Sequence, residues 1–488
     1  MYITRLHARN IKLLRSLTLD FTHEGAPRMW TVFVAESGAC KTTLLQAIAL
    51  AASGTERANQ LADVASLPDM RQTEPVARLS ADFQFGTQLG RWRRYPEPNL
   101  FATSREILRL RSSLEVRPGS RTFSGDSWFA PREVLASVRD EAPQLNAETL
   151  LTSFRGKPAL GGMSQLKMGL SSSDSTFFWQ MLSYAFTRKD QISEARARAF
   201  PGWFVAGYGT QRHLSAPAAT FGTKDRLLSR LEPLFGKASV VGTDFANTFT
   251  GTHYLESFIH ALRTVLVDNH LLPYVEAVEL SGTTGAGPPG ELFRSHGCAF
   301  SLSGQNTTVP APWLSQGYQS TLSWLADFIG QMFIDVGRPI PLADMEGLVL
   351  IDELDLHLHP SWQARLVPVL KRVFPRIQFI VTTHSPMLLP ALEPHEVVTL
   401  RLNEKGDVVA GAPPVYPPVM TEPEFQSDIS TLRSVYPGER GEELRRYTWL
   451  SSDPSRTEEQ EAEMWRLQKA LTEVGLDLGL PPVSRHRS

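Results

Sequence analysis

Residues 347–360 read Gly-Leu-Val-Leu-Ile-Asp-Glu-Leu-Asp-Leu-His-Leu-His-Pro. The run Leu348–Ile351 is apolar without alternation, as in a strand that is buried on both faces of a parallel sheet. It ends in Asp352 and Glu353, with Asp355 two residues further on. Ligands of α/β folds bind at the carboxyl ends of such strands, where adjacent acids suit metal-assisted phosphate chemistry. A core strand followed by a solvated turn would explain one acid but not this set, so the stretch predicts an α/β fold with a phosphate site.

A candidate phosphate-binding loop lies upstream, at residues 35–43. It reads Ala-Glu-Ser-Gly-Ala-Cys-Lys-Thr-Thr, follows the β-type run 31–34 and precedes the helical run 44–50. In such a strand–loop–helix unit, backbone N–H groups and the helix N-terminus hold a phosphate. Lys41 then reaches the outer phosphates, and the Thr42 hydroxyl binds Mg²⁺. The predicted ATP-binding residues are Ser37, Gly38, Ala39, Cys40, Lys41, Thr42 and Thr43.

The loop departs from the pattern G-x-x-x-x-G-K-[ST] at both terminal glycines. Ala35 and Cys40 stand at those positions, and Gly38 remains in the middle of the turn. Glycine suits this loop because the backbone approaches the phosphates and can adopt positive φ angles. A Cβ and a sulfur at position 40 should crowd the nucleotide or strain the loop. We therefore expect ATP hydrolysis to be attenuated.

Two further segments complete a set with the loop and the acids. Residues 314–322 read Leu-Ser-Gln-Gly-Tyr-Gln-Ser-Thr-Leu and open a helix with apolar residues at helical spacing. Ser315 is placed to cap this helix, and Gly317 permits close backbone approach to a ligand. Residues 377–381 form another apolar run, which ends in Thr-Thr-His-Ser-Pro. The histidine of that sequence, His384, therefore ends the strand that follows the acids.

The order of these segments, with the opening residues 1–11, resembles the ABC-type ATPase fold. More closely, it is similar to the soluble AAA-family group that includes OLD-family, recombination-mediator and chromosome-maintenance ATPases. The group also includes ATPase subunits of bacterial anti-phage systems of the Septu, retron-associated and PARIS type. The resemblance covers residues 1–50 and most of 310–390. It implies an α/β P-loop ATPase with a mixed β-sheet core, an antiparallel β subdomain and a helical insertion.

The resemblance implies a role for each matching residue, with ATP and Mg²⁺ as cofactors. Lys41 corresponds to the phosphate-binding lysine, and Thr42 corresponds to the magnesium-binding hydroxyl. Asp352 corresponds to the carboxylate that holds magnesium directly or indirectly. Glu353 corresponds to the general base that polarises the attacking water. His384 corresponds to the switch histidine that contacts the γ-phosphate. These roles suit phosphoryl transfer, which depends on positioned charge more than on covalent chemistry.

The same resemblance implies a homodimer or higher homo-oligomer that sandwiches the nucleotides. Ser315, Gly317 and Gln319 correspond to the signature motif, which contacts ATP bound to the other subunit. Asp355 corresponds to the loop that crosses the dimer interface. Gln211 follows a predicted strand and glycine turn and is a candidate for the glutamine that completes the magnesium shell. An ordinary loop glutamine is the alternative interpretation of Gln211.

The composition restricts compartment and partners. Two cysteines in 488 residues favour a reducing compartment over a disulfide framework. No apolar run is long enough to span a bilayer and no signal peptide is apparent, so we expect a cytoplasmic protein without a membrane partner. The net charge of −2 gives no general attraction to nucleic acid. Direct contact with DNA is left open, and the basic stretch 91–95 is interpreted as a solvated turn.

The motifs divide the chain into four expected parts. Residues 1–87 form a first ATPase lobe with the phosphate loop, and 88–200 form a helical or irregular insertion. Residues 201–400 return to the ATPase core, and 401–488 form a C-terminal strand and helical tail. A helix is expected from about Thr457, with a capping box and an apolar stripe that packs on its own domain or binds a partner. The stripe consists of Met464, Leu467, Leu471 and Val474.

Three functions fit these observations. The first is an ATPase subunit of a bacterial anti-phage defence or DNA-repair complex that regulates a separate effector. A nuclease is the favoured effector, because residues 401–488 are too few for the nuclease domain of the OLD family. The second is a nucleotide-binding scaffold with little catalysis, which the altered loop would suit. The third is a transporter ATPase, against which the H-L-H-P and T-T-H-S-P sequences argue.

Overall fold

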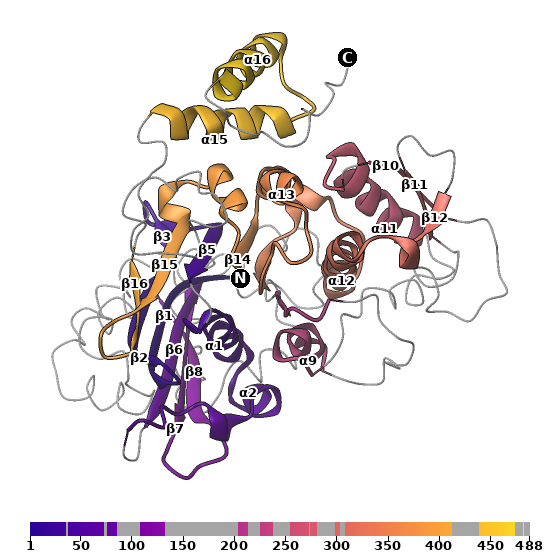
Figure 1. The fold of residues 1–488 in the computed structure, drawn as a ribbon. Helices are drawn as coiled ribbons and strands as arrows, with labels where there is room; N and C mark the ends of the chain where they lie inside the picture. Colours follow the sequence, from indigo (N-terminus) through magenta and orange to yellow (C-terminus); the bar gives the residue numbers. More distant parts are fainter. Residues whose placement is uncertain are drawn as a thin grey trace, which may run out of the picture.

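A six-stranded mixed sheet carries the segments that the sequence singles out (Figure 1). The structure is a computed structural model that describes residues 1–35, 38–72, 76–84, 108–131, 204–212, 225–237, 254–272, 274–280, 298–302, 308–411, 439–473 and 482. The strand order is β16-β15-β5-β14-β13-β9, and all pairs are parallel except β15 with β16. The strands are β5 (Trp30–Ala35), β9 (Val205–Tyr208), β13 (Gly347–Ile351), β14 (Ile377–Thr383), β15 (Val397–Leu402) and β16 (Val408–Gly411).

Strand β13 is buried on both faces, as its apolar run predicts. Leu348 and Leu350 point to a core shared with helix α1 (Lys41–Ser53) and the N-terminal sheet. Val349 and Ile351 point to a second core on the opposite face, under helices α12 and α13. The absence of alternation in the sequence therefore reflects two apolar layers, one on each side of the sheet.

The second sheet is antiparallel, with the order β2-β1-β6-β7-β8. Its strands are β1 (Tyr2–Ile11), β2 (Leu14–Asp20), β6 (Ala77–Gln84), β7 (Leu108–Val116) and β8 (Ser124–Pro131). Helix α1 contacts strands of both sheets and lies between them (Figure 1). The expected mixed core with an antiparallel β subdomain is confirmed.

Residues 108–131 differ from the helical or irregular structure expected for the insertion 88–200. They form β7 and β8, which pair with each other and extend the antiparallel sheet beyond β6. The reason is a period-two pattern in β7, where Leu110, Ser112 and Leu114 are all buried. Residues 88–107 and 132–200 lie outside the described part of the chain.

Helices cover the face of the mixed sheet opposite α1. They are α11 (Tyr254–Arg263), α12 (Gln316–Val336) and α13 (Pro360–Val373). A small antiparallel sheet, β10 (Val275–Leu280), β11 (Cys298–Leu302) and β12 (Thr308–Pro310), adjoins α11. The remaining short elements are α2 (Thr55–Leu61), α9 (Arg226–Leu231), the hairpin β3 (Thr22–His23) with β4 (Ala26–Pro27), a π-helical turn (Thr264–Asp268) and 3₁₀ turns at Val64–Ser66, Glu232–Phe235, Ala311–Trp313, Leu342–Asp344, Pro386–Ala391 and Pro394–Glu396.

Two C-terminal helices, α15 (Glu439–Ser452) and α16 (Glu458–Glu473), pack against each other, and α15 also contacts α13. The predicted capping box is present, because the Thr457 N–H donates to Gln460 Oε1 and the Gln460 N–H donates to Thr457 Oγ1. Met464 and Leu471 are fully buried against α15. The apolar stripe of α16 therefore packs on its own chain, while Val474 lies outside the described residues.

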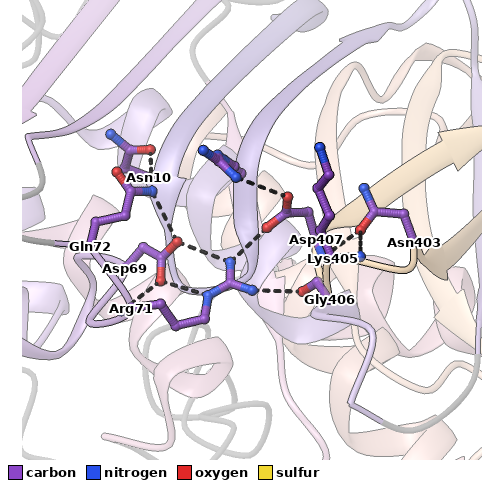
Figure 2. A network of polar contacts seen from close by, with 9 residues as sticks. Asn10, Asp69, Arg71, Gln72, Asn403, Lys405, Gly406 and Asp407 are labelled. Carbon is purple, nitrogen blue, oxygen red and sulfur yellow. Dashed lines mark hydrogen bonds and ion pairs between the residues drawn. The ribbon is translucent and has the colours of Figure 1, made fainter.

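A polar network joins the N-terminal lobe to the turn between β15 and β16 (Figure 2). Asp69 is 2% exposed and accepts hydrogen bonds from Arg71 Nε and Nη2, both at 2.9 Å. Arg71 Nη2 also donates to Asp407 Oδ1 at 2.8 Å, and Arg71 Nη1 donates to the Gly406 carbonyl oxygen. These bonds to Arg71 lower the pKa of Asp69 to about 2. One arginine thus ties together segments more than three hundred residues apart in sequence.

In the part of the chain that the structure describes, no helix combines the length and the apolar character needed to cross a membrane.

Candidate nucleotide-binding site

Four neighbouring strands bring the predicted site residues to one edge of the mixed sheet. Strands β5, β14, β13 and β9 are parallel to one another, so their carboxyl ends lie at the same edge. The phosphate loop follows β5, the acids follow β13, and the segment that contains His384 follows β14. Gln211 lies just beyond the end of β9 and is exposed. This is the edge at which α/β folds bind their ligands.

The phosphate loop has two left-handed residues. Gly38 has φ +89°, which glycine adopts without steric cost, and Cys40 has φ +59° at the N-cap of α1. Cys40 therefore pays the Cβ penalty that a glycine would avoid, about 1–2 kcal/mol. Ala35 differs, because it is a buried residue of strand β5 without a positive φ. Ser37 lies outside the described residues.

The Lys41 and Thr42 side chains make different contacts. Lys41 is buried, and its Nζ donates to the Ala35 carbonyl oxygen at 2.8 Å, so the ammonium folds back over the loop. Thr42 is exposed, and its Oγ1 donates to Asp352 Oδ2 at 2.6 Å. This bond directly joins the first helix of the chain to the acid at the end of β13. Two residues that are 310 positions apart thus meet as the motif order predicts.

Asp352 is held between two hydroxyl groups. Its Oδ1 accepts from Thr382 Oγ1 at 2.6 Å, and its Oδ2 accepts from Thr42. Asp352 is 4% exposed, and its backbone N–H donates to the Tyr208 carbonyl oxygen at 2.8 Å. Asp352 is therefore fixed from β14, α1 and β9 at once. Its position depends on the sheet and not on a loop.

Glu353 has a left-handed backbone, with φ +47°. Its N–H donates to Thr382 Oγ1 at 2.7 Å, and its carbonyl oxygen accepts from Arg212 Nη2 at 2.6 Å. The carboxylate is half-buried and has no hydrogen bond to any residue that the structure describes. The main chain of Glu353 is thus held on both sides while its acid group stays available for a ligand or a water.

Arg212 is a residue of this site that the sequence analysis missed. It is 2% exposed, and burial lowers its pKa to about 10. Three neighbouring carboxylates oppose that shift, namely Asp352, Asp355 and Glu353. The guanidinium therefore stays charged at neutral pH and balances the acids. In the sequence, only its position next to Gln211, just after a predicted strand, indicated a role for Arg212. That position is weak evidence unless the fold is known.

The segment after β14 connects to the loop that contains Asp355. Asp355 Oδ1 accepts a hydrogen bond from Thr383 Oγ1, and Thr383 Oγ1 accepts from the Ser385 N–H at 2.9 Å. The Ser385 hydroxyl donates to Gln363 Oε1 on α13. His384, between these residues, is half-buried, and its ring has no hydrogen bond to another described residue. Hydrogen bonds thus hold the residues on either side of His384, whereas the His384 ring makes none with the described residues.

The signature segment contacts the turn after the acids. A Cβ on Gly317 would lie 2.5 Å from the His357 carbonyl oxygen, so glycine is needed for the approach of α12 to that turn. The backbone at Gly317 thus closely approaches the chain's own turn. Ser315 occupies the N-cap position without a side-chain hydrogen bond. Gln319 Nε2 donates to the carbonyl oxygens of Leu314 and Pro312, at 2.7 and 2.9 Å.

Comparison with known families matches residues 291–389 to the family described as "AAA domain, putative AbiEii toxin, Type IV TA system". Residues 291–389 are thus similar to an AAA-family ATPase domain. The matched range contains the signature segment, the acids and His384 but not the phosphate loop. Lys41 and Thr42 lie outside the matched residues, and the fold brings this part of the chain into contact with the matched range through the bond between Thr42 and Asp352.

Part of this chain is similar to curated proteins. The Septu protein PtuA of Bacillus thuringiensis is 39% identical over 110 residues, which cover 22% of this chain and 28% of that protein. The Retron Ec83 probable ATPase of Escherichia coli is 39% identical over 100 residues, which cover 20% of this chain and 18% of that protein. The chain thus matches less than a third of the length of either relative. A solved SMC head bound to the C-winged helix domain of ScpA has 15% identity and a TM-score of 0.41, over 84% of this chain and 98% of that one.

Thr42 and Asp352 fit a magnesium–nucleotide complex. Mg²⁺ bound together with ATP uses one or two carboxylates, phosphate oxygens and waters. Asp352 Oδ2 and Thr42 Oγ1, 2.6 Å apart, are oxygens of the type that Mg²⁺ prefers. The described residues hold no group of three or more His, Cys, Asp or Glu side chains arranged for a metal ion. Asp352 and Thr42 would hold the ion jointly with the nucleotide.

Proposed function

We propose that this chain binds and hydrolyses ATP as the ATPase subunit of a bacterial anti-phage defence or DNA-repair complex. The observation that carries the ATPase proposal is the joining of Thr42, Asp352 and Glu353 at the carboxyl edge of the sheet. The similarity to Septu and retron ATPases supports the defence context. A separate effector, with a nuclease as the favoured class, would respond to the nucleotide state. DNA is a further candidate ligand.

The proposed roles divide the chemistry among the residues at this edge of the sheet. Lys41 Nζ donates to the Ala35 carbonyl oxygen and would exchange this acceptor for phosphate oxygens. Thr42 and Asp352 would hold Mg²⁺, which neutralises charge on the phosphates when bound. Glu353, with its free carboxylate, would orient the attacking water and accept its proton. His384 would contact the γ-phosphate, and Gln211 would complete the magnesium shell.

We propose that a second copy of the chain closes the site. Ser315, Gly317 and Gln319 would contact the ATP of the partner subunit, and Asp355 would lie at the interface. Gln319 and Gly317 are both fixed within their own chain, so this face is ordered before a partner arrives. Closing a second subunit over ATP excludes water and adds hydrogen-bond donors, both of which strengthen transition-state stabilisation.

The test measures Mg²⁺-dependent ATP binding, phosphate release and molar mass of the full chain. Lys41→Ala should abolish binding, whereas Glu353→Gln should keep binding and lower turnover by about a hundredfold or more. Because it traps ATP, Glu353→Gln should also double in mass by light scattering when ATP is added. Lys237→Ala is the matched control, because Lys237 is exposed and its Nζ donates to the Gln60 carbonyl oxygen instead.

Two results would contradict the proposal. One is absence of ATP binding by the wild-type chain in the presence of Mg²⁺, which would favour a scaffold without nucleotide. The other is wild-type turnover by Glu353→Gln, which would remove Glu353 from catalysis. Copurification of the chain with the products of neighbouring genes tests the effector, and membrane components in that complex would favour a transporter.

A further inference from the structure

Arg212 combines nearly complete burial with incomplete hydrogen bonding. Its Nη2 donates to the Glu353 carbonyl oxygen, whereas Nε and Nη1 have no hydrogen-bond partner among the described residues. A buried arginine with spare donors is costly unless nearby charge compensates it. The compensating charges here are the carboxylates of Asp352, Glu353 and Asp355. Arg212 is therefore held in the site by acids, and its one described side-chain hydrogen bond goes to the main chain of Glu353.

The Glu353 main chain needs such support. A glutamate with φ +47° occupies a region that residues with a Cβ seldom adopt, and surrounding contacts must maintain it. Thr382 holds the N–H side of this residue. On the carbonyl side, Arg212 Nη2 at 2.6 Å and the Leu356 N–H at 3.0 Å both donate to the oxygen. Because the left-handed backbone sets the direction of the Cα–Cβ bond, these contacts fix where the carboxylate can reach.

We propose that Arg212 is a positioning residue that keeps Glu353 in its left-handed conformation and so directs the Glu353 carboxylate at the attacking water. This inference rests on the proposed function of Glu353 as the general base. Arginine suits the task because its planar guanidinium can hold a carbonyl oxygen with one N–H while its charge faces several acids. Lysine offers a single compact ammonium and would reproduce the charge but not the fixed geometry.

The test is a double-mutant cycle in the full chain between Arg212→Met and Glu353→Gln, read by single-turnover hydrolysis and by ATP affinity. Alone, Arg212→Met should lower the hydrolysis rate by about tenfold or more and change the ATP dissociation constant by less than about twofold. In the Glu353→Gln background the same substitution should cause little further loss, since groups that act as a unit are not additive. Arg212→Lys should recover part of the rate.

Arg230→Met is the matched control. Arg230 is 1% exposed and also has two N–H groups without a partner among the described residues, but it pairs with Asp335 at 3.1 Å. Its substitution should lower the melting temperature and leave the hydrolysis rate of folded protein within about twofold. If Arg212→Met fails to fold, Arg212→Lys carries the same cycle.

Three results would contradict the inference or its premise, and each has a different meaning. Weaker ATP binding at an unchanged hydrolysis rate would overturn positioning and assign Arg212 to phosphate contact. Equal rate losses in the wild-type and Glu353→Gln backgrounds would overturn action through Glu353. A wild-type chain that does not hydrolyse ATP, or a fully active Glu353→Gln, would instead refute the proposed function on which the inference rests.

Discussion

At the scale of single residues, the two departures from the glycine pattern of the phosphate loop have different consequences. Ala35 ends a buried strand, where its methyl group adds to the core and needs no special backbone. Cys40 adopts φ +59°, where a side chain is unfavourable. The strain that the sequence predicted therefore belongs to Cys40 alone. Arg212, by contrast, could not be predicted as a site residue, because its place in the site depends on burial beside acids that are distant in sequence.

Cys40→Gly should relieve this strain. We expect the free energy of unfolding to rise by about 0.5–1 kcal/mol, because the left-handed penalty exceeds the entropy cost of a glycine. ATP turnover should rise as well, since the loop can then approach the phosphates. Urea denaturation and phosphate release measure the two effects. Cys40→Ala keeps the Cβ and removes the sulfur, so an equal gain in that variant would assign the effect to the thiol and not to the backbone.

At the scale of elements, the apolar runs predicted the strands that carry the site. Strands β5, β13 and β14 and helix α12 lie where the sequence placed them, because both faces of the sheet are buried and the runs are continuous. Strands β7 and β8 were missed, since arginines and serines dilute the alternation of β7. The contact between Gly317 and His357 was also missed, because spacing cannot show which backbone approaches a glycine.

Gly317→Ala tests that contact between elements. The new methyl group would lie 2.5 Å from the His357 carbonyl oxygen, which is backbone, so the N-terminus of α12 or the turn must shift. We expect the free energy of unfolding to fall by about 1–3 kcal/mol. Ser315→Ala, two residues away, removes a hydroxyl that makes no cap bond and should change stability by less than about 0.5 kcal/mol. Equal stability of both variants in chemical denaturation would show that the helix moves without cost.

At the scale of the whole molecule, the network around Arg71 connects the antiparallel lobe with the edge of the mixed sheet (Figure 2). Helix α1 lies between the same two sheets, so their relative position also sets the position of the phosphate loop. No sequence pattern predicted this connection. Arg71 and Asp407 are 336 residues apart, and neither belongs to a recognisable motif.

Asp69→Asn tests the network through its pH dependence. The pKa of Asp69 is about 2 in the folded chain against an ordinary value of 3.8, so its carboxylate contributes stability that is fully present above about pH 4. That contribution is lost as the pH falls from 3.8 toward 2. Because Arg71 is 40% exposed, we expect only about 1 kcal/mol at pH 7 after solvent screening. Urea denaturation of the wild type and Asp69→Asn should show this difference at pH 7 and a smaller one at pH 3. A difference that stays constant across this range would mean that Asp69 acts through its shape and not through its charge.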